Sequence, residues 1–131
     1  MEAKAEAKAF TGHCNCKSTY NGNPVGTDFN TERVVFDQRT FQATMNTNFV
    51  QMLYGPENLE PGEHLLTFVQ DGVPQLEYYN GNRRLKLAGT GKVTIGENLD
   101  TQEGTIDANY LDDVGRLIAF KGTFSGKYEL K

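Results

Sequence analysis

The residues best placed for chemistry lie in the motif His13-Cys14-Asn15-Cys16. Thiolate and imidazole groups are the usual ligands of zinc and copper, so the motif raises the question of a metal site. A structural zinc site needs four ligands, and the chain has only two cysteines and one further histidine, His64. On an extended strand the two cysteines share one face while His13 points to the other. We therefore predict that both thiols pack in the core, with metal binding, redox chemistry and an intermolecular bridge as the alternatives.

The segment Gly12-His13-Cys14-Asn15-Cys16 also resembles the first zinc half-site of the glutathione-dependent formaldehyde-activating enzymes. That resemblance implies a zinc cage completed by a second cysteine pair. The sequence contains no such pair, so we reject this family and predict neither a metal nor a cofactor.

Acidic side chains form a second group that could carry chemistry, because paired carboxylates can hydrolyse glycosides or bind calcium. They cluster in predicted loops, at Glu57, Glu60 and Glu63, at Glu97, Asp100 and Glu103, and at Asp107, Asp112 and Asp113. Turns select acidic and amide residues on their own account. We interpret these clusters as solvated hairpin tips and keep a small hydrolase using loop carboxylates as an alternative.

A third group surrounds the predicted turn Asn80-Gly81-Asn82, where tyrosine and arginine side chains gather. Tyrosine and arginine are the residues that most often anchor interfaces. Since Tyr78 and Tyr79 are adjacent on a predicted strand, one should face the core and the other the surface. The predicted ligand or partner site comprises Tyr79, Asn80, Asn82, Arg83, Arg84, Tyr54 and His64.

The elements that must position these residues are strands. The run from Arg116 to Leu130 places Ile118, Phe120 and Phe124 on one parity, the period-two pattern of a half-buried strand. Further strands are predicted at 10–20, 33–36, 40–45, 63–70, 74–80, 84–96 and 104–111, with a hairpin turn at Asp71-Gly72. The segment 46–55 is ambiguous, because Phe49, Met52 and Leu53 have helical spacing.

This spacing predicts a single all-β domain over residues 10–131. The expected architecture is an antiparallel β-sandwich or closed β-barrel of about eight or nine strands that ends in a three-stranded meander. The interior of that meander should contain Val93, Ile95, Ile106, Ala108, Tyr110, Ile118, Phe120 and Phe124.

Composition and charge bear on the possible partners and on the location of the protein. The net charge of −4 and the lack of a basic stripe argue against nucleic-acid binding. No apolar run reaches the roughly 20 residues of a transmembrane helix. Residues 1–9 alternate alanine with glutamate or lysine and predict a flexible leader that is an added segment or a mature end. Strands containing Gly104-Thr105-Ile106 and Gly122-Thr123-Phe124 resemble those of small secreted or lipoprotein-type bacterial β domains, which implies an exported protein with its signal removed.

Together these observations predict a soluble, non-enzymatic binding or interaction module whose partner is another protein, a second copy of the chain or a small ligand. The first alternative is a barrel-type carrier, in which the phenylalanine-rich inner face lines a cavity for an apolar ligand. The second is the loop-carboxylate hydrolase. A filled interior would exclude the carrier and leave only surface sites.

Overall fold

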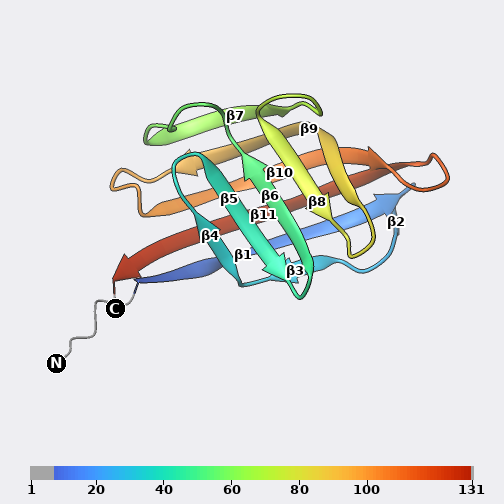
Figure 1. Ribbon diagram of the computed structural model, residues 1–131, viewed down its shortest axis with the longest axis horizontal. Coiled ribbons are helices and arrows are strands. Elements are labelled where there is room, and N and C mark those ends of the chain that lie inside the picture. The colour runs from blue at the N-terminus through green and yellow to red at the C-terminus, as the bar shows by residue number, and fades with distance from the viewer. Residues whose placement is uncertain (1–7, 131) are drawn as a thin grey trace.

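The computed structural model describes residues 8–130, and these fold as one curled antiparallel sheet without a helix (Figure 1). The strands are β1 (Lys8–Tyr20), β2 (Asn23–Pro24), β3 (Phe29–Thr31), β4 (Val34–Phe36), β5 (Thr40–Met45), β6 (Asn48–Leu53), β7 (Gly62–Phe68), β8 (Gln75–Tyr79), β9 (Arg84–Ile95), β10 (Thr101–Leu111) and β11 (Leu117–Leu130). The predicted all-β, antiparallel, single-domain fold is confirmed. The sheet is a half-barrel rather than two stacked sheets. Most of the predicted leader, residues 1–7, lies outside the described residues, and β1 begins two residues earlier than predicted.

Sheet order follows the path β2-β1-β11-β10-β9-β8-β6-β5-β4, with β3 paired to β1 and β7 paired to β9. The predicted closing meander is β9, β10 and β11. Its last strand then pairs with β1 over almost its whole length, from Lys8 opposite Leu130 to Thr19 opposite Ala119. The two ends of the described chain therefore lie side by side (Figure 1).

The backbone conformation of Gly89 allows β9 to pair with two different strands. Gly89 has a φ of 147°, and a Cβ atom there would lie 2.5 Å from the Cα atom of Ala108. Before this bend β9 pairs with β8, and from Gly89 onward it pairs with β7. The predicted hairpin at Asp71-Gly72 is therefore wrong, because β7 and β8 follow one another along the same edge of β9 instead of pairing together.

A second bend joins the two ends of the sheet path. The segment from β3 to β4 pairs with β1 through β3 and with β5 through β4. At the corner, the backbone N–H of Thr44 donates to the carbonyl of Arg33 at 3.0 Å, and the Thr31 hydroxyl donates to the carbonyl of Thr44 at 2.6 Å. The sheet thus curls back on itself through one short piece of chain.

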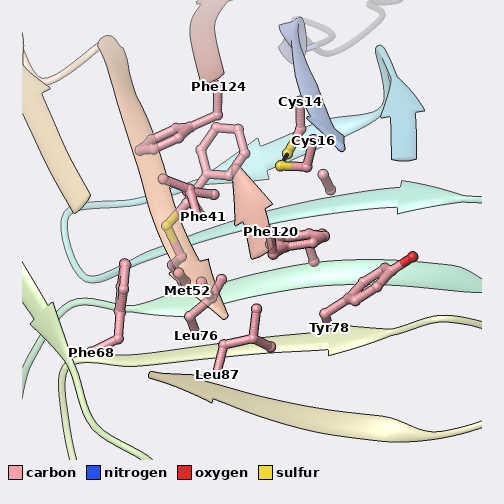
Figure 2. Close-up of a cluster of buried hydrophobic side chains, with 14 of the residues drawn as sticks. Cys14, Cys16, Phe41, Met52, Phe68, Leu76, Tyr78, Leu87, Phe120 and Phe124 are labelled. Atoms are coloured by element: carbon pink, nitrogen blue, oxygen red, sulfur yellow. Dashed lines mark hydrogen bonds between the residues drawn. The ribbon is translucent and has the colours of Figure 1, made fainter. Parts of the chain in front are cut away.

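The interior of the half-barrel is filled by side chains (Figure 2). Rings from β11 meet rings from the facing strands: Phe124 contacts Phe41 with centroids 4.7 Å apart, and Phe120 stacks on Tyr78 at 4.6 Å. The eight residues predicted for the inner face of the meander are all buried. Even at Gly126 an added Cβ would lie 2.6 Å from the ring of Phe36.

The ambiguous segment 46–55 is a strand, so its helical alternative is wrong. Val50, Met52 and Tyr54 are buried at period two, and β6 pairs with β5 on one side and β8 on the other. The strands on both sides complete its backbone hydrogen bonds, and this pairing overrides the weak helical spacing of the sequence.

The bend at Gly89 generates a stability prediction. Gly89→Ala should reduce the free energy of unfolding by at least about 2 kcal/mol, because its backbone conformation and the contact with Ala108 both oppose a side chain. Gly55→Ala is the matched control, since no atom lies within 4 Å of its added Cβ, and it should change stability by less than about 0.5 kcal/mol. Urea denaturation measures both, and equal effects would contradict this role for Gly89.

Candidate binding pocket at one end of the half-barrel

Three connections meet at one end of the half-barrel and enclose a pocket of about 410 Å³, here called the mouth pocket. They are the β8–β9 turn, the β10–β11 turn and the segment after β2. The polar lining residues are Ser18, Thr27, Asn48, Tyr78, Asn80, Arg83, Tyr110, Asp112, Asp113 and Arg116, and Val25, Gly26 and Val114 complete the wall.

Two tyrosines and a serine form the inner part of the pocket. The Tyr110 hydroxyl donates to the Oγ atom of Ser18 at 3.1 Å, and both residues are buried. Tyr78 is only 5% exposed, yet its hydroxyl makes no hydrogen bond with any other residue of 8–130. Figure 2 shows this hydroxyl pointing away from the other labelled side chains. The mouth pocket is therefore lined by a buried hydrogen-bonding group that the described chain leaves unused.

Burial raises the pKa of Tyr78 to about 12, with smaller contributions from Tyr110, Cys16 and Asp28. The phenol therefore stays neutral at physiological pH and retains its proton. A neutral phenol can both donate and accept a hydrogen bond.

Two ion pairs form the rim of the mouth pocket. Arg83 of the β8–β9 turn contacts Asp113 at 2.6 Å, and Arg116 contacts Asp112 at 2.7 Å. The first pair joins two turns that are 30 residues apart in the sequence. Two positive and two negative charges cancel, so this rim offers polar groups without a net charge.

Asp112 is held in its ionised form. Burial by itself raises its pKa, but the backbone and side-chain hydrogen bonds from Arg116 and the backbone N–H of Val114 outweigh this effect and lower it. The carboxylate accepts from both backbone N–H groups, at 2.8 Å and 3.0 Å, and so also shapes the β10–β11 turn.

The structure distributes the predicted site residues over several places. Asn80 and Arg83 line the mouth pocket. Asn82 lies in the same turn, where its backbone N–H donates to the side chain of Asn80. Tyr54 belongs to the core, with its hydroxyl donating to Gln102 at 2.7 Å, so it offers no surface for a ligand. His64 lies on β7, where its ring bonds the carbonyl of Glu60.

Tyr79 and Arg84 lie on the outer face of the sheet beside the mouth pocket. Arg84 is paired with the buried carboxylate of Glu77 at 2.5 Å, and this contact raises the pKa of the guanidinium. Its guanidinium also lies 5.6 Å from the ring centroid of Phe49, which in turn contacts Tyr79. The Arg84 guanidinium therefore already has its partners within the protein. The expected division between adjacent tyrosines is confirmed, with Tyr78 buried and Tyr79 half-buried.

Sequence reasoning missed the other half of the pocket. Tyr110 was expected only as a core residue, and Asp112 and Asp113 only as turn residues. The Asp112–Arg116 pair sits at i and i+4 and could have been noticed. The Arg83–Asp113 contact could not, because it depends on two turns meeting in space.

The His13-Cys14-Asn15-Cys16 motif is part of the scaffold. Both cysteines are buried and free, with their sulfur atoms 3.9 Å apart (Figure 2). The hydrogen bond with Cys16, followed by burial, raises the pKa of the Cys14 thiol, so it remains protonated. His13 is on the opposite face, where its Nδ1 atom bonds Ser125 at 3.0 Å. Within residues 8–130 no group of three or more His, Cys, Asp or Glu side chains is arranged to hold a metal ion. Core packing of the two thiols is confirmed.

Comparisons of the chain with protein-family models, with curated proteins and with solved structures found no match. Among the described residues, no helix long and apolar enough to cross a membrane is present.

The unpaired Tyr78 hydroxyl generates a stability prediction. Tyr78→Phe should leave the free energy of unfolding within about 0.5 kcal/mol of the parent or increase it, because it removes a buried polar group that has no partner. Tyr110→Phe should cost about 1 kcal/mol, because it breaks the bond to Ser18. Urea denaturation distinguishes them, and an equal loss in both variants would show that the Tyr78 hydroxyl is paired.

The pKa of Tyr78 generates a prediction for alkaline pH. Tyr78 holds its proton more tightly in the folded state, with a pKa of about 12, than in the unfolded state, with a pKa of about 10. Its contribution to stability is therefore complete below about pH 10 and is lost as the pH rises toward 12. Tyr78→Phe lacks this loss, so its urea midpoint should fall less than that of the parent between pH 9 and about 11.5. Parallel curves would contradict the assignment.

Proposed function

We propose that this protein is a non-enzymatic binding module that holds a small, uncharged, hydroxyl-rich ligand in the mouth pocket. The observation that carries this proposal is the buried Tyr78 hydroxyl, which lines the pocket without a hydrogen-bond partner among residues 8–130. Such a group costs about 1–3 kcal/mol when neither solvent nor a ligand supplies a partner. A ligand that displaces solvent from the pocket must therefore place a hydroxyl group against it.

The chemistry of the rim supports this class of ligand. Arg83 and Arg116 are each paired with an aspartate, so no unpaired charge on them favours an ionic ligand. The amides of Asn48 and Asn80 add both donors and acceptors to the lining. Hydroxyl groups also donate and accept, so a ligand with several of them, such as a sugar or a cyclitol, fits a mixed lining of this kind.

The filled interior argues against the apolar carrier. A carrier needs an internal cavity, whereas the space between β11 and the facing strands is occupied by contacting rings, including Phe41, Phe120 and Phe124. An apolar ligand would have to displace side chains that are at most 1% exposed. Binding at the open end requires no such rearrangement.

The state of the carboxylates argues against the hydrolase. A general acid in glycoside hydrolysis needs a raised pKa, whereas the pKa of Asp112 is lowered by its hydrogen bonds. Asp113 is occupied by Arg83. These carboxylates are better suited to fixing the turns than to transferring protons.

The proposal is tested by titrating isotope-labelled protein with D-glucose, D-galactose and myo-inositol and recording amide chemical shifts. At least one neutral probe should bind with a dissociation constant below about 10 mM and shift the amides of the β8–β9 and β10–β11 turns. Tyr78→Phe and Arg83→Ala should each weaken binding by about 5- to 100-fold through a lost ligand hydrogen bond. Arg39→Ala, on an exposed turn outside the pocket lining, is the matched control and should bind like the parent.

D-glucuronate and D-glucosamine serve as the charged comparison. They should bind more weakly than the corresponding neutral probe if the rim charges cancel as the geometry indicates. The proposal fails if no neutral probe shifts these turns, or if Tyr78→Phe and Arg83→Ala both bind like the parent.

A further inference from the structure

The outer edge of β7 is a second surface, separate from the mouth pocket. β7 pairs with β9 on one side through seven consecutive residues, Gly62 to Phe68. In the described part of the chain no strand pairs with its other side, and Figure 1 shows β7 at the border of the sheet. An edge strand directs alternate backbone N–H and C=O groups outward, where they can pair with another chain.

This edge lacks the protection found at the two ends of the sheet path, β2 and β4. β2 is only two residues long and contains Pro24, which has no backbone donor. β4 is three residues long and lies against β1. β7 has seven residues without a proline, lysine or arginine, and Glu63 near its start is its only acidic residue. Natural proteins normally block open edges with prolines, lysines or short strands, so an unblocked edge of this length leaves its backbone groups available for strand pairing.

The side chain at the midpoint of β7 is apolar and exposed. Leu65 is 79% exposed, more than any other large hydrophobic residue recorded as exposed in the described chain. It stands on the outer face of the sheet, opposite Lys92 of β9. A leucine held in water at the centre of an open edge would lose contact with water if a second strand were added beside it.

We propose that β7 pairs antiparallel with β7 of a second copy of this chain, about a twofold axis that passes through Leu65. Because Leu65 is the midpoint of the strand, this register pairs all seven residues, with residue 62 opposite 68 and 63 opposite 67. The two Leu65 side chains then cover one another. Glu63 lies opposite Thr67, so the acidic residues do not face each other. The pairing is isologous and uses up the edge in both copies, so it closes as a dimer.

The dimer should be weak and dependent on concentration. Pairing one seven-residue edge buries less than the roughly 1,200 Å² of a standard stable interface. A dissociation constant between about 1 µM and 1 mM is therefore expected. Sedimentation velocity of the full chain from about 10 µM to 1 mM should show conversion from one monomer mass to twice that mass.

Substitution at the midpoint tests the register. Leu65→Lys places two like charges opposite each other on the twofold axis and should weaken the dimer at least 10-fold. The residue is exposed, so the folded monomer should be retained, as circular dichroism can verify. Leu117→Lys is the matched control, because Leu117 is 58% exposed on β11, away from β7, and it should leave the dimer unchanged.

A crosslink tests the geometry independently. Directly opposed residues of an antiparallel pair have Cβ atoms about 4.5–5.5 Å apart, close enough for a disulfide to form with a small adjustment of the backbone. Leu65→Cys should therefore give a covalent dimer under mild oxidation, whereas Leu117→Cys should form no covalent dimer. Cys14 and Cys16 are buried and do not compete.

The proposal is overturned if the chain stays monomeric up to about 1 mM, if Leu65→Lys dimerises like the parent, or if Leu117→Cys crosslinks as readily as Leu65→Cys. The outcome is independent of ligand binding. Tyr78→Phe and Arg83→Ala lie at the mouth pocket and should dimerise like the parent.

Discussion

Ring packing across the curled sheet is the interaction on which this structure depends. Phe120 and Phe124 of β11 contact Tyr78 of β8 and Phe41 of β5 on the facing side, with centroid distances of 4.6 and 4.7 Å. A sheet of this length would otherwise expose one apolar face to water. Curling brings the inner faces of distant strands together and buries their rings at the density of a protein interior.

The same packing determines where function can reside. The packed rings fill the space that an apolar ligand would need. They also hold the ring of Tyr78 in place, while its hydroxyl lies at the mouth pocket. The turns around that hydroxyl are held by side chains rather than by the sheet, through the Arg83–Asp113 and Arg116–Asp112 pairs. The core leaves two surfaces free: the open end of the half-barrel, where we propose ligand binding, and the edge of β7, where we propose strand pairing.

Sequence periodicity predicted the parts of the fold in which buried and exposed residues simply alternate along a strand. The inner residues of the meander, the strand at 40–45 and the opposed Tyr78 and Tyr79 follow from period two alone. It failed in the segment 46–55, where burial depends on strands on both sides, and at Asp71-Gly72, where a turn sequence was mistaken for a hairpin. The burial of Tyr54 was missed for the first reason, because its hydroxyl donates to Gln102, a buried residue 48 positions away.

The sequence by itself determined the class of fold, the inner face of the closing strands and the burial of the two cysteines, because alternation along a strand is a local property. Only the tertiary structure decided which turns meet, since the contact between Arg83 and Asp113 spans 30 residues. It also decided that β7 has an open edge. The bend at Gly89 lets β9 pair with β8 over one half and β7 over the other. Among residues 8–130, β8 therefore lies between two strands and β7 beside one. No local sequence pattern indicates which of the two strands keeps an open edge, because this depends on the direction that β9 takes after the bend.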